Sequence, residues 1–110
     1  MTITVEPVRV SPAEAVLVVR VELDAPLPGA AARGTLVGPR CPGVSTVEIA
    51  YRLEPLPAVG DTVLSLRAVV PEPNLWSPAA PFRYDGRAEV WVDAAKVGER
   101  PFAVELRPRG

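Results

Sequence analysis

Apolar and polar residues alternate one by one along most of this chain. A two-residue period places successive side chains on opposite faces of a strand, so it predicts β-strands with one buried face. Seven segments carry the pattern, and no helical period exceeds it over a helix-length window. The expected strands are residues 2–10, 14–24, 33–38, 44–54, 62–70, 84–94 and 99–107.

The same alternation predicts the core side chains. One face of 14–24 holds Ala15, Leu17, Val19, Val21 and Leu23. The later strands contribute Val47, Ile49, Tyr51 and Leu53, then Leu64, Leu66, Ala68 and Val70, then Ala88, Val90, Val92 and Ala94, and finally Phe102, Val104 and Leu106.

Proline and glycine mark the breaks between these strands. Pro7 inside the first strand indicates an edge or a bulge. The segment 95–98 reads as a hairpin connection with Gly98 where positive φ is easiest. Turn signals come roughly every dozen residues, which is typical of a two-sheet sandwich. We therefore expect a single domain over residues 1–110, all-β, a seven-stranded immunoglobulin-like antiparallel β-sandwich with Greek-key connections.

The stretch 71–84 is too long and too rich in proline for a hairpin or a helix. It fits a crossover between the two sheets, stiffened by its prolines, with Leu75 and Trp76 holding it in place. Two interpretations of Trp76 are open. It fills the end of the core, which we prefer, or it stacks on a sugar ring.

The crossover also resembles a known family. Asn74-Leu75-Trp76-Ser77-Pro78 followed by Pro81-Phe82-Arg83-Tyr84 is similar to the segment Leu-Trp-Ser-Pro-Glu-x-Pro-x-Leu-Tyr. That segment belongs to the immunoglobulin-like sandwich domain of glycoside hydrolase family 2, which includes β-galactosidases, β-glucuronidases and β-mannosidases. The resemblance covers residues 62–94.

The resemblance implies a structural role. In that family the catalytic glutamates lie in a separate barrel domain, so none is transferred to this chain, and the sandwich spaces and docks its neighbours. We accordingly expect a domain cut from a longer chain. The expected crossover residues are Leu75, Trp76, Pro78, Pro81 and Tyr84.

Trp91 is the candidate for contact with a neighbouring domain. By strand parity its side chain points away from Val90 and Val92 and therefore out of the core. An outward tryptophan is often an interface residue. The alternative is a loop of the same domain lying over it, and the sequence does not separate the two.

The composition limits the kinds of functional site that we expect in this chain. The net charge is −1, with acidic and basic residues interspersed, so no basic stripe predicts nucleic-acid binding. The chain has no histidine, and Cys41 is a single cysteine without an activating partner. Paired carboxylates such as Glu22 with Asp24, or Asp85 with Glu89, lie on flat strand faces and read as solvated. We expect no catalytic site, cofactor or metal.

No signal peptide or membrane span is visible, which slightly favours the cytoplasm without establishing the compartment. The preferred function is a non-catalytic accessory domain of a larger carbohydrate-active enzyme, with neighbouring domains as its partners. Two alternatives are a carbohydrate-binding module that uses an exposed tryptophan and an assembly module that associates through a strand edge.

Overall fold

The structure is a computed structural model that describes residues 1–108, and these form seven strands and no helix. None of the described residues belongs to a helix that could cross a membrane. All strand pairings are antiparallel, so the predicted all-β class and the strand number are confirmed. The strands are β1 (Thr2–Val10), β2 (Glu14–Glu22), β3 (Ala30–Arg40), β4 (Ile49–Pro55), β5 (Val63–Pro71), β6 (Arg83–Val92) and β7 (Ala95–Val104).

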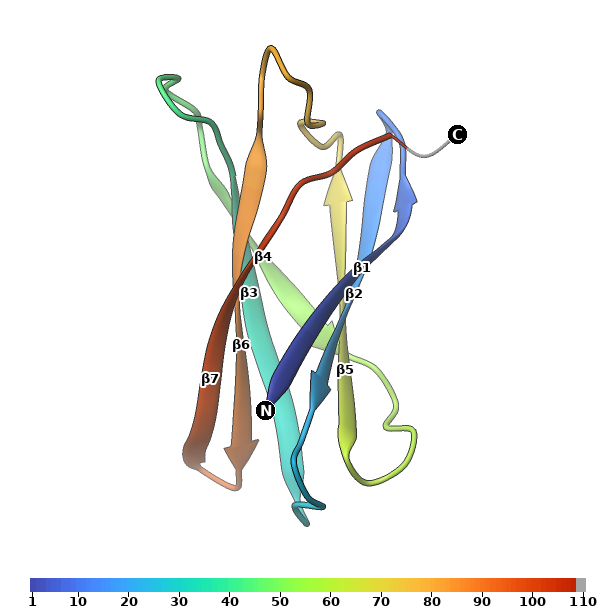
Figure 1. Cartoon of the computed structure of the whole chain (residues 1–110). Coiled ribbons are helices and arrows are strands. Elements are labelled where there is room, and N and C mark those ends of the chain that lie inside the picture. The colour runs from blue at the N-terminus through green and yellow to red at the C-terminus, as the bar shows by residue number, and fades with distance from the viewer. Residues whose placement is uncertain (109–110) are drawn as a thin grey trace.

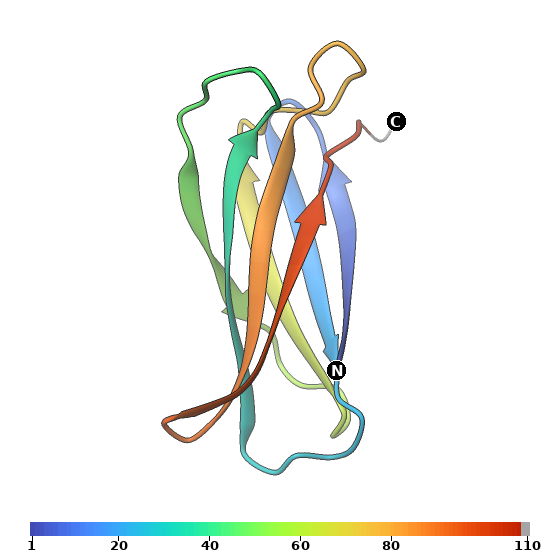
Figure 2. The ribbon, with the colours of Figure 1, turned by 60° about the vertical axis from the view of Figure 1, so that its left-hand side comes forward.

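The strands form one strongly curled sheet in the order β1-β2-β5-β4-β3-β6-β7. Figures 1 and 2 show its two halves as facing layers, β1-β2-β5 and β3-β6-β7. This grouping is that of an immunoglobulin-like sandwich. β4 connects the layers: five of its residues pair with β3 and only Glu54 and Pro55 pair with β5. Residues 72–82 run from β5 to β6, so the predicted crossover between layers is confirmed.

A single hydrophobic core fills the space between the layers. Its fully buried side chains include ones predicted by alternation along β2, β5 and β6, such as Leu17, Leu66 and Val90. Leu36 and Tyr84, which were not among the predicted core residues, are also fully buried. Val104 and Leu106 close it from the last strand and the segment after it. Because residues of both halves belong to one cluster, burial of this shared core holds the halves together.

Three glycines on the inner face make room for large neighbours. A Cβ on Gly34 would lie 2.6 Å from the Leu53 side chain, and one on Gly38 would lie 2.7 Å from the Tyr84 ring. A Cβ on Gly86 would collide with the ring of Phe102, its cross-strand partner. Glycine in a strand interior marks such close approaches.

Two sequence predictions need correction. Residues 44–48 are a loop rather than part of a strand, with Val44 53% and Val47 86% exposed, and Ile49 at the start of β4 is 51% exposed. Of that predicted inward set only Leu53 is buried, and Tyr51 is half-buried. The alternation is real, but past Arg40 the chain has no neighbouring strand to pair with until Ile49.

The last hairpin also turns earlier than predicted. The turn is Asp93-Ala94, with Asp93 at φ 53°, and 95–98 belong to β7. Ala94 is therefore exposed rather than inward. Asp adopts the left-handed conformation more readily than most residues, which allows it to replace glycine here.

Both sheet edges carry proline, as predicted for the first strand. β1 has a register shift between Pro7 and Arg9, and β7 contains Pro101. Edge prolines and bulges discourage the addition of further strands.

Candidate functional site

The crossover is anchored by Tyr84. This residue is the first buried residue of β6 and is 1% exposed. Its hydroxyl accepts a hydrogen bond of 3.0 Å from the Asn74 backbone N–H. The arrangement is similar to the tyrosine corner of immunoglobulin-like domains, in which a tyrosine at the start of the sixth strand binds upstream backbone. Burial raises the pKa of Tyr84. Tyr84 is thus bonded to the crossover through its hydroxyl.

Trp76 does not fill the core. It is only partly buried and lies outside the core cluster, against which Leu75 packs instead. Its backbone N–H donates to the Leu106 carbonyl at 2.8 Å, and the Arg107 guanidinium carbon lies 3.8 Å from its ring centroid. The core-filling role predicted for Trp76 therefore belongs to Tyr84, while Trp76 ties the crossover to the segment after β7.

Two prolines shape the tip of the crossover. Ser77 and Ala80 exchange backbone hydrogen bonds of 3.1 Å, so Pro78 and Ala79 form the two-residue tip of a tight turn. Pro78 is exposed, and Pro81, which follows the turn, is half-buried. Both lie where a fixed φ favours turns and extended backbone.

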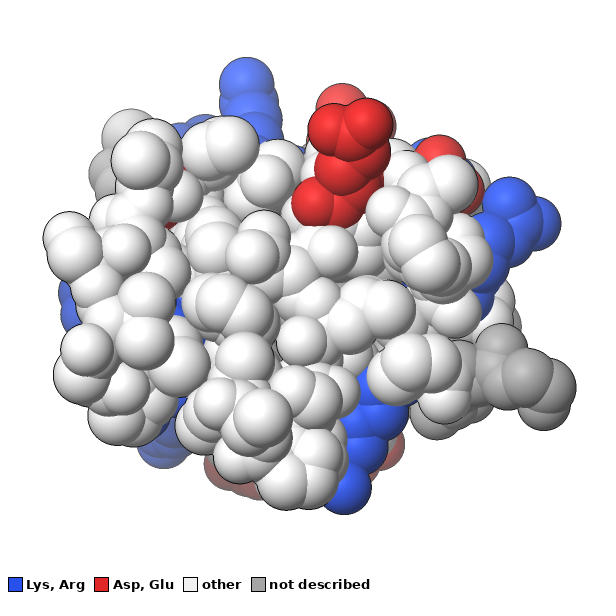
Figure 3. Space-filling view, turned by 90° about the horizontal axis from the view of Figure 1, so that it is seen from above, with Lys and Arg blue, Asp and Glu red and all other residues white. Residues whose placement is uncertain are grey.

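A pocket of about 470 Å³ opens at the same end of the molecule, where the loop before β4 meets the crossover. We name it the end pocket; its walls include Ser45, Tyr51, Glu72, Asn74 and Phe82, and Tyr84 also borders it. β4 and β5 pair only at Glu54 and Pro55, so they diverge toward this end (Figure 1). Viewed from above, this end of the molecule is mostly uncharged, and charged side chains stand mainly around its rim (Figure 3).

The end pocket contains polar groups without partners. Among residues 1–108, the side chains of Ser45, Tyr51, Glu72 and Asn74 make no hydrogen bond or ion pair. No described polar side-chain atom is both buried and unsatisfied, so the hydroxyl of half-buried Tyr51 reaches solvent. Of the described residues that line the pocket, Glu72 is the one that carries a charge. Glu72 also has a φ of 45°, in a region that non-glycine residues seldom occupy.

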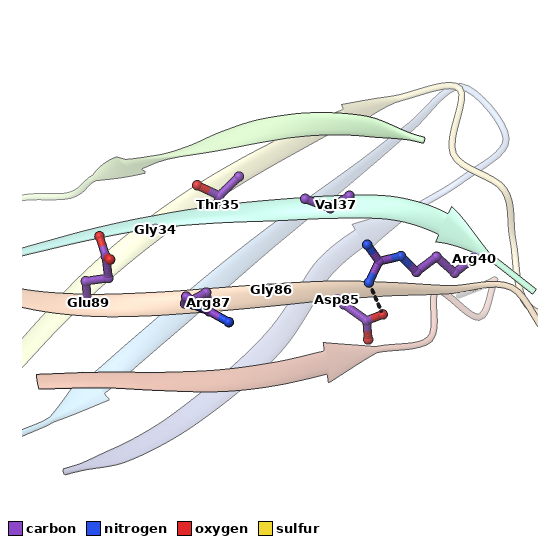
Figure 4. A pocket seen from close by; sticks show the side chains of 8 residues that line it. All are labelled: Gly34, Thr35, Val37, Arg40, Asp85, Gly86, Arg87 and Glu89. Carbon is purple, nitrogen blue, oxygen red and sulfur yellow. Dashed lines mark hydrogen bonds and ion pairs between the residues drawn. The ribbon is translucent and has the colours of Figure 1, made fainter. Parts of the chain in front are cut away.

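A second hollow of about 290 Å³ lies on the outer face of β3 and β6 (Figure 4). Its four charged side chains already have partners. Arg40 binds Glu48 at 2.8 Å and Asp85 at 2.9 Å, Arg87 binds Glu99, and Glu89 binds Lys96. This hollow is therefore a neutralised ion-pair surface, without an unpaired charge for a ligand.

The hydrogen bond and charge of Arg40 hold the pKa of Glu48 below its ordinary range. The same pairing, with the help of Asp85, raises the pKa of Arg40. Arg40 thereby connects the loop before β4 to the sixth strand.

Trp91 lies on this outer face, as strand parity predicted. It is half-buried: the Arg33 guanidinium carbon lies 4.6 Å from its ring centroid, and its indole Nε1–H donates to Glu89 at 3.3 Å. The cover comes from side chains of β3 and β6 rather than from a loop.

The described residues show no catalytic arrangement. They contain no group of three or more histidine, cysteine, aspartate or glutamate side chains that could hold a metal. Asp85 pairs with Arg40 and Arg83, and Asp24 pairs with the N-terminal amine.

Sequence reasoning missed the end pocket. Residues 44–48 alternate like a strand, so their contact with the crossover was not expected. Pro42-Gly43 before them indicates a turn, but this signal does not show what the following residues contact.

Comparison of the chain with protein-family models and with curated proteins finds no match.

Proposed function

We propose that this chain is a non-catalytic accessory domain that spaces and docks neighbouring domains of a larger carbohydrate-active enzyme resembling family 2 glycoside hydrolases. The family assignment rests on residues 74–84. A rigid role is supported by the single core shared by both halves and by the anchored crossover.

The spacing role is supported by where residues near the two ends of the chain are attached. Met1 binds Asp24, beside the loop that leaves β2, with its amine 3.1 Å from the carboxylate. Leu106 binds Trp76 in the crossover at the other end (Figure 1). The longest dimension of the molecule is 45 Å. Neighbours joined to residues near these two points would be held apart along this axis.

Docking is proposed for the outer face around Trp91. Half-buried aromatic side chains bordered by charged residues are typical of interfaces. Here Arg33 lies over the ring, Glu89 accepts from the indole N–H, and Lys96 pairs with Glu89. The Lys96–Glu89 ion pair can rearrange toward a partner.

Two alternatives receive less support. A carbohydrate-binding module built on tryptophan needs an open ring face. One face of Trp76 already carries the Arg107 guanidinium, and one face of Trp91 carries that of Arg33. An assembly module needs an accessible strand edge, and both edge strands contain proline.

The test begins with the coding sequence on either side of residues 1–110. We expect a continuous reading frame that encodes a (β/α)₈ pattern. The adjacent domain would then be produced separately and titrated with this chain by calorimetry, using wild type and Trp91→Ala.

We expect Trp91→Ala to weaken this association by about 2 kcal/mol or more, which is typical of an interface hot spot. Val97→Ala, at an exposed position of β7, is the matched control and should bind as wild type does. A chain without flanking domains, or equal binding by Trp91→Ala, would contradict the proposal.

A further inference from the structure

We propose that the end pocket binds a neutral carbohydrate of one or two sugar rings. This goes beyond the accessory role and places the ligand away from both tryptophans. The argument rests on the size of the pocket, its aromatic lining, its unpaired polar side chains and its charge.

Size and lining agree with a small polar ligand. A volume of about 470 Å³ lies within the usual range for small-molecule pockets. Tyr51 and Phe82 are half-buried and contribute aromatic surface to the lining. Aromatic rings offer a flat apolar surface of the kind against which the C–H groups of a sugar ring pack.

The polar groups provide recognition of hydroxyls. Ser45 and Tyr51 each present a hydroxyl, Asn74 presents an amide and Glu72 a carboxylate, and no described residue occupies them. A hydroxyl or amide group both donates and accepts hydrogen bonds, so this set can satisfy several sugar hydroxyls at once.

The charge of the pocket selects among ligands. Among residues 1–108, Glu72 is the one charged residue of its lining, and no arginine or lysine of that range contributes. A phosphate or a uronic acid would meet a carboxylate without a compensating cation, which is unfavourable. Anionic ligands are therefore disfavoured, and choline in the titration below distinguishes a neutral ligand from a cationic one.

The experiment is a ¹⁵N-HSQC titration of the 110-residue chain with cellobiose, lactose and mannobiose in turn. At least one sugar should cause chemical-shift changes at the amides of Ser45, Tyr51, Asn74 and Phe82. These changes should saturate with a Kd in the millimolar range. Glucuronic acid and choline serve as anionic and cationic probes and should shift these amides less.

Variants identify the groups responsible. Asn74→Ala removes the amide but keeps the backbone N–H that donates to Tyr84. Tyr51→Phe removes only a hydroxyl that has no partner among residues 1–108. Each should weaken binding about fivefold, the effect of one lost hydrogen bond. Phe82→Leu should weaken it about tenfold through the loss of the ring. Trp91→Phe, on the outer face, should bind as wild type does.

Three outcomes would overturn the proposal: no shift with any of the three sugars, shifts centred on Trp91 or Trp76, or a stronger response to choline or glucuronic acid. The accessory role is tested separately by the partner titration, so failure of one leaves the other standing.

Discussion

At the scale of single residues, two neighbouring tyrosines differ in whether the hydroxyl has a hydrogen-bond partner in the protein. The Tyr84 hydroxyl is buried and holds the crossover through Asn74, whereas the Tyr51 hydroxyl has no partner among the described residues. Their ring centroids lie 6.4 Å apart. The pair therefore separates the structural value of a buried hydrogen bond from that of the ring.

We expect Tyr84→Phe to lower the free energy of unfolding by about 1–2 kcal/mol, because the Asn74 N–H loses its acceptor. Tyr51→Phe is the matched control and should change it by less than about 0.5 kcal/mol. Urea denaturation followed by tryptophan fluorescence measures both. Equal losses in the two variants would mean that the hydroxyl of Tyr84 does not anchor the crossover.

At the scale of the elements, alternation predicted β2, β5 and β6 well because each of these strands has a hydrogen-bonded neighbour on both sides and one face on the core. It failed for residues 44–48, since a sequence period records the spacing of apolar residues but not the presence of a partner strand. The crossover could be predicted from its prolines. The end pocket could not, because it depends on two loops that are distant in sequence.

The loop before β4 depends on an ion pair at its end. The pKa of Glu48 is lowered by Arg40, so the folded state favours the charged carboxylate. Its contribution to stability is present above the ordinary carboxyl pKa and is lost as pH falls through the lowered value. We therefore expect Glu48→Gln to show a smaller loss of melting temperature than wild type on acidification from neutral pH.

Thermal unfolding over a series of pH values measures this difference. Glu54→Gln is the control, because Glu54 is exposed and has no ion pair among residues 1–108. It should reproduce the acid sensitivity of wild type. Unchanged acid sensitivity in Glu48→Gln would indicate that Arg40 contributes nothing measurable through Glu48, as for many surface pairs.

At the scale of the whole molecule, the curled sheet has two free edges, β1 and β7, at opposite ends of the strand order. Each edge carries a proline, Pro7 or Pro101. An exposed edge is a site for pairing with another chain, and proline is one of the residues that prevents it. The fold is thus protected at the positions where a small sandwich is most prone to associate.

We expect the wild-type chain to sediment as a monomer and the double variant Pro7→Thr/Pro101→Thr to associate at concentrations where wild type does not. Threonine restores a backbone donor and favours strand structure. Pro57→Thr, in an exposed loop, is the control and should stay monomeric. A double variant that remains monomeric would show that shape or charge, rather than proline, protects the edges.

The three inner-face glycines have a consequence for engineering the domain. Glycine is a poor strand former, so a designer who raises strand propensity would replace Gly34, Gly38 and Gly86 first. Each replacement would force a side chain against Leu53, Tyr84 or Phe102. The residues that look weakest in the sequence are therefore the ones that stabilising redesign must leave unchanged, or change only together with the large side chain opposite.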